Sequence, residues 1–324
     1  MFLPVPCQFL LYVEEIAMLN LFVTYKCSLN CNYCFANGLT DDFPSAMTWE
    51  NFSRLSHWIK KNGVVALALL GGEPTLHPQI AEIISYLRNG GVMTALFTNG
   101  LFKEGLREVL AGNVTNFVVN YNDPSTYLDS QWKLLQGNLG YLVEKGCRVG
   151  FSKNFAKQYT RYDYLLDACR EYGVKHVRYD ITRPNPKKYN GHYDLEDTKK
   201  VLDVVVSFVR ECDAGGVKTG LDCCIPLCYF NAVDAEFLKK VSTKFSGICH
   251  PSIDIHPDLS ASYCLPMRRV TVDDVTKYSG ERALFKHFSE SVRNIRFDNP
   301  SPACMECSDF KTRCQGGCLA LKGG

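Results

Sequence analysis

The sequence predicts an α/β fold in which parallel strands alternate with helices, most simply as a barrel. One indication is the continuous apolar run at residues 64–70, which is typical of a strand covered on both faces. Another is the helical spacing of apolar residues from Ile80 to Leu87, which ends at Gly90. Strands that alternate with helices favour parallel pairing and right-handed crossovers. An open doubly wound sheet is the alternative, and in both folds the site lies at the carboxyl ends of the strands.

The remaining elements follow the same alternation. Strands are expected at residues 18–25, 64–70, 92–97, 116–121, 148–152 and 175–181. Helices are expected at residues 48–63, 80–87, 128–142, 162–172 and 194–209. Thr48 and Asp194 are expected to cap the first and the last of these helices, because their side-chain oxygens can accept from backbone N–H groups. The alternation fades at residues 212–222, so we expect an N-terminal extension (1–17), a barrel (18–215) and a cysteine-rich domain (216–324).

Composition limits the classes of partner and compartment. The 324 residues include 36 basic and 34 acidic side chains, and this balance gives no reason to expect nucleic acid or a membrane surface as a partner. No apolar run reaches the roughly 18 residues of a membrane span. The apolar N-terminus has no Lys or Arg before Lys26 and is interrupted by Glu14 and Glu15, unlike an export signal. We therefore expect a cytoplasmic chain. Its cysteines number 16, and where they are clustered we expect them to bind metal in preference to forming disulfides.

Three cysteines follow the first strand directly. Cys27, Cys31 and Cys34 form a C-x3-C-x2-C motif in a short loop at the expected mouth of the barrel. Iron–sulfur cubes usually take four cysteines, so three leave one iron open for chemistry. A zinc site completed from elsewhere in the chain and a set of reduced core cysteines are the alternatives.

Two further motifs lie at the ends of the next strands. Gly71, Gly72, Glu73 and Pro74 end the second strand, where the glycines permit close approach of the backbone. The Glu73 carboxylate is placed where it can accept from an ammonium group. Residues 98–100 (TNG) end the third strand at the same rim. Each motif alone is also compatible with an ordinary turn.

Together, the order and spacing of these motifs resemble the radical S-adenosylmethionine (radical SAM) superfamily. The resemblance implies a partial (β/α)6 TIM-type barrel and a 4Fe–4S cluster on the three cysteines, whose open iron SAM chelates. It assigns Gly71, Gly72 and Glu73 to the SAM ammonium and Tyr33 to the adenine. Polar residues on later strands are candidates for contact with SAM, and the same residues are also compatible with ordinary turns and rims: Asn99, Asn120, Ser152 and Arg178.

The resemblance also implies an activity. A reduced cluster cleaves SAM, and the resulting 5′-deoxyadenosyl radical abstracts hydrogen from a substrate. We expect a ribosomally synthesised peptide as the substrate, modified by crosslinking or epimerisation, and an external one-electron donor of the flavodoxin or ferredoxin type. The same chemistry on a small metabolite or on a protein side chain is one alternative. A non-catalytic iron–sulfur or zinc protein that transfers electrons or binds partners is another.

The C-terminal region carries a second cysteine system. Cys304, Cys307, Cys314 and Cys318 form C-x2-C-x6-C-x3-C, which is compatible with a zinc ribbon or with auxiliary iron–sulfur clusters. The region resembles the SPASM extension of peptide-modifying radical SAM enzymes, with a hairpin at residues 251–263. By position, the resemblance assigns Cys249, Cys264 and Cys318 to one auxiliary 4Fe–4S cluster, and Cys304, Cys307 and Cys314 to another.

This region departs from the SPASM pattern. One gap has six residues where the family has five, Leu259 stands where a glycine is usual, and no cysteine follows Cys318. Cys228, together with Cys224 or Cys223, can supply the fourth ligands. A single cluster, as in the shorter twitch extension, and a truncated chain are alternatives.

Cysteines outside these sets have other expected roles. Cys223 and Cys224 are candidate hydrogen donors to a substrate radical, although one can instead be a ligand while the other fills space. Cys7, Cys147 and Cys169 are expected in the core.

Overall fold

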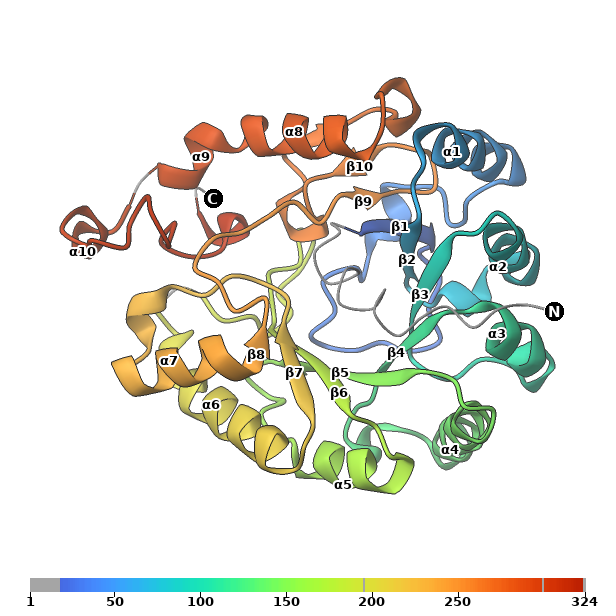
Figure 1. Cartoon of the computed structure of the whole chain (residues 1–324), viewed down its shortest axis with the longest axis horizontal. Coiled ribbons are helices and arrows are strands. Elements are labelled where there is room, and N and C mark those ends of the chain that lie inside the picture. Colours follow the sequence, from blue (N-terminus) through green and yellow to red (C-terminus); the bar gives the residue numbers. More distant parts are fainter. Residues whose placement is uncertain (1–17, 195, 299, 323–324) are drawn as a thin grey trace.

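A computed structural model describes residues 18–194, 196–298 and 300–322. Its main sheet follows the chain order, and each strand pairs in parallel with the next (Figure 1). These strands are β1 (Leu19–Thr24), β2 (Ala66–Gly71), β3 (Met93–Thr98), β4 (Asn116–Asn120), β5 (Val149–Phe155), β6 (His176–Ile181), β7 (Lys218–Leu221) and β8 (Ser242–Thr243). A doubly wound sheet would reverse its strand order, so the sequential order confirms the predicted barrel type.

The C-terminal region extends the sheet at its other edge. β9 (Asp254–Ile255) pairs in parallel with β1, and β10 (Ala261–Ser262) and β11 (Thr271–Val272) follow in antiparallel pairing. The β9–β10 pair confirms the predicted hairpin. β8 and β11 are the two edges of the sheet, so the barrel is partial. The sheet continues through β7 and β8, beyond the boundary expected near Gly215.

Helices surround the sheet on its outer side (Figure 1). They are α1 (Trp49–Asn62), α2 (Ile80–Asn89), α3 (Arg107–Asn113), α4 (Asp129–Glu144), α5 (Asp163–Tyr172), α6 (Lys199–Ala214), α7 (Ala232–Val241), α8 (Glu281–Ser291), α9 (Arg293–Phe297) and α10 (Pro302–Met305). Thr48 caps α1 as predicted: its hydroxyl accepts from the Asn51 N–H at 3.2 Å. The predicted cap at Asp194 is wrong, because α6 begins at Lys199 and the Asp194 carboxylate accepts from Asp197 N in a preceding turn.

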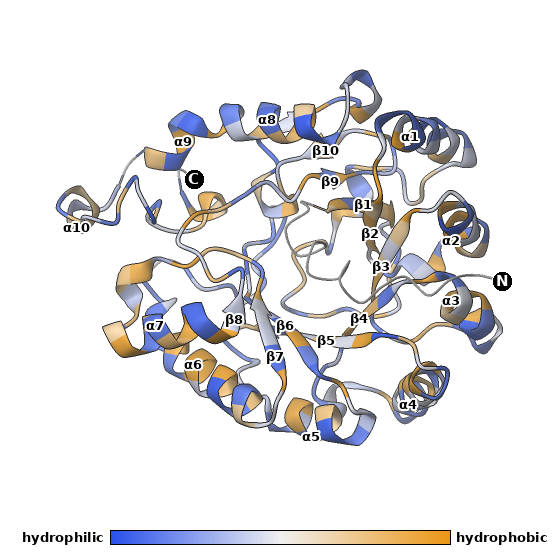
Figure 2. Ribbon diagram, in the orientation of Figure 1, coloured by the Kyte–Doolittle hydropathy of each residue, from blue (hydrophilic) through white to orange (hydrophobic). Residues whose placement is uncertain are grey.

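The core lies between the sheet and these helices. Leu69 of β2, Ile84 of α2 and Leu96 of β3 belong to one buried apolar cluster. Figure 2 shows hydrophobic residues concentrated on β1 to β3, whereas β6 and β7 carry more hydrophilic ones. No described helix is long and apolar enough to cross a membrane.

Candidate functional site

The three N-terminal cysteines lie in the loop that leaves β1, called here the thiol loop (residues 26–34). Cys27 is exposed, while Cys31 and Cys34 are half-buried, and the Cys34 N–H donates to the Cys31 carbonyl at 3.1 Å. Burial, together with the neighbouring thiols of Cys31 and Cys27, raises the pKa of the Cys34 thiol to about 11. The structure thus brings together the three cysteines that the sequence singled out.

The end of β2 lies directly against this loop. The Gly72 N–H donates to the Thr24 carbonyl at 2.8 Å, and the Glu73 N–H donates to the Lys26 carbonyl at 2.7 Å. A Cβ atom at Gly72 would lie 2.5 Å from the carbonyl oxygens of Tyr25 and Lys26. Only glycine permits this approach, because the neighbouring atoms belong to the backbone and cannot move aside.

Glu73 joins the ends of β2 and β3 through its buried carboxylate. Oε1 accepts from the Thr75 hydroxyl at 2.6 Å and the Thr98 hydroxyl at 2.8 Å, and Oε2 accepts from the Asn99 N–H at 2.7 Å. Burial raises the pKa of Glu73, and these hydrogen bonds oppose the rise. A carboxylate has about four acceptor positions, so Oε2 has capacity for another donor such as an ammonium group.

Polar side chains tie the thiol loop to the later strands. The Asn99 amide nitrogen lies 3.1 Å from the Ser28 hydroxyl and 3.9 Å from the Cys27 sulfur. The Tyr33 hydroxyl accepts from the Asn120 amide at 2.8 Å and donates to Asn122. Asn122, which the sequence interpretation missed, also lies 4.0 Å from the Cys31 sulfur. The sequence feature that could have identified Asn122 is its position just past the end of β4.

The other predicted SAM residues form one row across the sheet. Asn120 pairs with Ser152, and Ser152 pairs with Arg178, on the adjacent strands β4, β5 and β6. The Arg178 guanidinium donates to the Ser152 hydroxyl at 2.8 Å and forms an ion pair with Asp222. Asn99 directly follows the end of β3, the strand that pairs with β4. Asn99 and Asn120 thus lie at strand ends, whereas Ser152 and Arg178 continue the same row within β5 and β6.

These residues fit a bound SAM molecule. The Asn120 amide oxygen is buried and has no hydrogen-bond partner, which is costly unless a ligand supplies a donor. Oε2 of Glu73 has unused acceptor capacity on the same rim. Tyr33 is buried, and its ring packs edge-on against the ring of Tyr159, with 5.5 Å between the centroids. This packing supports the Tyr33 hydroxyl in its contacts with Asn120 and Asn122.

The C-terminal cysteines fall into two sets. The first thiol group is Cys224, Cys249, Cys264 and Cys318. Its members influence one another electrostatically: after burial, Cys249 and Cys318 are the largest causes that raise the pKa of Cys264. The Tyr263 hydroxyl donates to the Cys249 sulfur at 3.5 Å. The thiols of Cys224 and Cys249 shift each other's pKa directly, which joins Cys224 to the three residues that the resemblance grouped. Cys318 also raises the pKa of Cys223, so Cys223 lies beside the same group.

The second thiol group is Cys228, Cys304, Cys307 and Cys314. All four line one pocket of about 330 Å³, together with Tyr229 and Phe310. Cys228 lies in a short 3-10 helix (Leu227–Tyr229), far from the other three in sequence. The Cys314 sulfur accepts from the Gly316 N–H at 3.3 Å, and the Cys304 sulfur accepts from the Ser301 hydroxyl at 3.3 Å.

The spread of the thiols bears on the kind of metal site. Across residues 18–194, 196–298 and 300–322, no three His, Cys, Asp or Glu side chains are arranged around a single metal ion. Four ligands of a zinc ion meet at one point, with sulfur at about 2.3 Å from the metal. Each thiolate of a cubic iron–sulfur cluster instead binds its own iron.

The remaining cysteines occupy varied positions. Cys169 is buried, as predicted, and Cys147 is partly buried against the core. Cys7 lies outside the described residues. Cys223 follows β7, where Asp180 and Arg183 are among the charged groups that influence its pKa, which burial raises well above its ordinary range.

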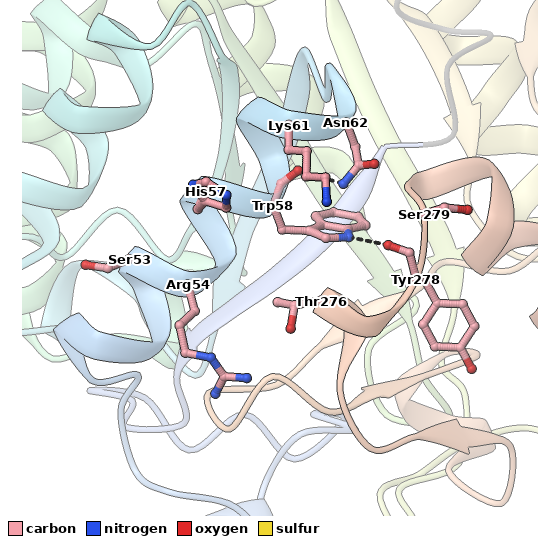
Figure 3. Close-up of a pocket in the computed structure, with 9 residues that line it drawn as sticks. All are labelled: Ser53, Arg54, His57, Trp58, Lys61, Asn62, Thr276, Tyr278 and Ser279. Atoms are coloured by element: carbon pink, nitrogen blue, oxygen red, sulfur yellow. Dashed lines mark hydrogen bonds between the residues drawn. The ribbon is translucent and has the colours of Figure 1, made fainter.

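A larger pocket of about 590 Å³ lies elsewhere, between α1 and residues 276–279 (Figure 3). The Trp58 indole N–H donates to the Tyr278 carbonyl across it at 2.7 Å. Its lining contains no cysteine and none of the motif residues, so it is separate from the site described above.

Comparisons with known proteins agree with this geometry. The Radical SAM superfamily model matches residues 21–138. A curated relative, the probable GTP 3′,8-cyclase of Methanococcus maripaludis, is 27% identical over 256 residues, which cover 74% of this chain and 82% of the relative.

Two solved structures share the fold. Streptococcus suis SuiB with S-adenosylmethionine matches at TM-score 0.67 and 19% identity, covering 96% of this chain and 75% of SuiB. The anSMEcpe protein with bound AdoMet matches at TM-score 0.69 and 19% identity, covering 93% of this chain and 88% of that protein. The family uses SAM and a 4Fe–4S cluster, whose three predicted cysteine ligands lie together in the thiol loop. The chain thus contains a radical SAM domain, matched over residues 21–138.

Proposed function

We propose that this chain is a peptide-modifying radical SAM enzyme with two auxiliary 4Fe–4S clusters. The observation that carries the proposal is the division of eight C-terminal cysteines into two groups of four, each complete without a ligand from elsewhere. Four cysteines satisfy a cubic cluster, so both groups suit storage or transfer of electrons. The three cysteines of the thiol loop suit the cluster that binds SAM.

The chain's own residues would hold SAM at the carboxyl ends of β1 to β6. Glu73 would accept from its ammonium group, and Asn120 would accept through its unpaired amide oxygen. Ser152 and Arg178 would complete the polar row on the far side. When bound and reduced by an external one-electron donor, the cluster and SAM supply a radical that abstracts hydrogen from the substrate. The protein's task is then to orient one C–H bond and exclude water.

Two observations favour a peptide substrate. The structural match to SuiB and anSMEcpe extends over at least 93% of this chain, including the cysteine-rich region. Both proteins have also been solved with peptides: SuiB with the precursor peptide SuiA, and anSMEcpe with the Kp18Cys peptide. The 27% identity to a probable GTP 3′,8-cyclase favours a nucleotide as the second candidate.

Cys223 is the better candidate for a hydrogen donor than Cys224. Cys224 belongs to the first thiol group, and the Gln315 amide lies 3.7 Å from its sulfur. Cys223 is not needed to complete either group of four and is not fully buried. A thiol at the end of β7 would return a hydrogen atom to a substrate radical, which results in epimerisation. A Cys223→Ala variant should then cleave SAM but leave the substrate configuration unchanged.

The radical chemistry is tested by anaerobic reconstitution with iron and sulfide, followed by reduction with dithionite in the presence of SAM. Wild-type protein should form 5′-deoxyadenosine, and Cys31→Ala should not, because two thiolates cannot replace three. Cys147→Ala, which removes a thiol on the outer core, is the control. Formation of 5′-deoxyadenosine by the Cys31→Ala variant would contradict the proposal.

The substrate class is tested with two probes. GTP is added to the reduced enzyme and its consumption is followed by chromatography. A synthetic copy of a short peptide encoded beside this gene is treated in the same way and examined by mass spectrometry for loss of two hydrogens or for hydrogen exchange from D₂O. Turnover of GTP without change in the peptide would replace the peptide proposal with the nucleotide one.

A further inference from the structure

Arg183 is a buried cation without sufficient partners. Its side chain is 4% exposed, and it follows β6 at the inner end of the barrel. One terminal nitrogen donates to the Cys224 carbonyl at 3.2 Å and lies 3.5 Å from a carboxylate oxygen of Asp180. Its Nε is buried and has no hydrogen-bond partner. A buried charge with one distant counter-ion and an unpaired N–H group is unfavourable unless another anion lies beside it.

The nearest candidate anions are the thiolates of the first thiol group. Burial disfavours the charged form of Arg183, but Asp180 and the thiols of Cys318, Cys223 and Cys224 favour it, and its pKa is raised. The reciprocal effect is present, because Arg183 favours the thiolate form of Cys318. The Arg183 guanidinium lies beside this group of cysteines, because it donates to the backbone carbonyl of Cys224 at 3.2 Å.

Other cations near the thiols are better satisfied. Arg296 donates to the Cys249 carbonyl at 2.8 Å and to the Gln315 side chain. Lys322 donates to the carbonyl oxygens of Arg296 and Gln315. Backbone and amide oxygens therefore satisfy these two side chains, whereas Arg183 keeps a buried donor unused.

We propose that Arg183 is a positioning residue that lies against the auxiliary cluster held by Cys224, Cys249, Cys264 and Cys318 and raises its reduction potential. This inference rests on the proposed function, since it requires that cluster. A reduced cluster carries one more negative charge than an oxidised one, so a nearby buried cation stabilises the reduced form. Asp180, whose carboxylate lies 3.5 Å from the guanidinium, has the opposite effect. The Arg183–Asp180 pair thereby makes the reduction potential of the auxiliary cluster depend on charges in the barrel interior.

The test measures reduction potentials in the full chain with Cys27, Cys31 and Cys34 replaced by Ala, so that only auxiliary clusters remain. Dithionite titration is followed by electron paramagnetic resonance. Arg183→Gln should lower the potential of one cluster and leave the other unchanged, because the second thiol group is not beside Arg183. Arg183→Lys, which keeps the charge, should restore most of the potential. Arg107→Gln, on the outer helix α3, is the control and should change neither potential.

A second variant keeps the inference testable if Arg183→Gln does not fold. Asp180→Asn removes the negative charge beside the guanidinium with little change in shape, so it should raise the same potential. A purely structural role would not give shifts of opposite sign for Arg183 and Asp180. Cluster retention gives a further readout: Arg183→Gln should lose iron to a chelator roughly 10-fold faster, as outer-shell substitutions commonly do.

The outcomes separate the two proposals. If the triple-alanine chain binds no iron after reconstitution, the auxiliary clusters are absent and the proposed function fails with them. If it binds about 8 irons, as two cubic clusters require, but both potentials are unchanged in Arg183→Gln and Asp180→Asn, only the role of Arg183 is wrong. Arg183 would then be free to bind an anionic group of the substrate.

Discussion

The thiol loop and the C-terminal region use cysteine in different ways. The thiol loop presents three cysteines within eight residues of sequence, next to a rim of amides and a carboxylate that have unused hydrogen-bonding capacity. The C-terminal region gathers two groups of four from segments up to 94 residues apart (Cys224 to Cys318). Three protein ligands leave a cluster able to bind a small molecule, whereas four reserve it for electrons. In the proposed function, the difference in ligand number therefore assigns cleavage of SAM to the N-terminal cluster and electron transfer to the auxiliary clusters.

The largest expected effect comes from removing one ligand of the second thiol group. Cys228→Ser should lower the iron content by up to about 4 irons per chain, because the second thiol group loses its only upstream member, while cleavage of SAM continues. Cys212→Ser, which changes a buried cysteine of α6, is the matched control and should keep all of the iron. Iron and sulfide analysis after anaerobic reconstitution measures both. A Cys228→Ser protein with undiminished iron would mean that another residue completes this group.

The contact that joins the two regions should make the apo protein sensitive to acid. The His256 ring accepts or donates between the Tyr25 hydroxyl at 2.6 Å and the Ser262 hydroxyl at 2.8 Å, linking the end of β1 to β10. Burial lowers the pKa of His256 to about 4. Folding therefore favours the neutral ring, and its contribution is complete above the unfolded pKa of about 6.5 and is lost as pH falls towards 4.

The loss amounts to about 3 kcal/mol of unfolding free energy over that range, from a shift of roughly 2.5 units at 1.36 kcal/mol each. Urea unfolding of the apo protein at pH values from 4 to 7 measures it. His256→Asn should reduce this dependence on pH, although the variant will be less stable at pH 7. An unchanged slope in His256→Asn would show that other groups cause the acid sensitivity.

The smallest expected effect concerns the hairpin that lies between Cys249 and Cys264 of the first thiol group. Leu259 has φ 72°, a left-handed conformation that favours glycine, and its side chain is fully buried. Leu259→Gly would relieve roughly 1–2 kcal/mol of backbone strain but lose roughly 1.5–3 kcal/mol of apolar burial. We expect a net loss of about 1 kcal/mol in urea unfolding. Leu259→Ala, which loses the burial and keeps the strain, should be less stable than Leu259→Gly.

Much of the fold was predictable because its signals are local. The strands and helices from residue 18 to residue 181 follow apolar periodicity and glycine stops, and most appear within a few residues of their predicted bounds. The short helix α3 was missed, since seven residues carry little periodicity. The predicted cap at Asp194 was wrong because that carboxylate, five residues before the start of α6, satisfies a local turn.

The grouping of the distant cysteines could not be predicted. Nothing in the order of Cys223, Cys224 and Cys228 along the chain says which joins which group. Their partition depends on the turn after β7, which directs Cys224 towards Cys249 and places Cys228 in the pocket with Cys304. No sequence pattern singled out Arg183, because arginines that follow strands are common. Only its burial in the folded chain makes this one unusual.

The sequence by itself determined the alternation of strands and helices, the three-cysteine loop and the turns that follow β2 and β3, because these depend on spacing within one strand and the turn that follows it. Only the tertiary structure decided which thiols stand together, which donor is left unpaired beside them and how the C-terminal strands extend the sheet past β1. Those features depend on contacts between segments far apart in the chain, and their positions in space follow from the packing of the whole barrel.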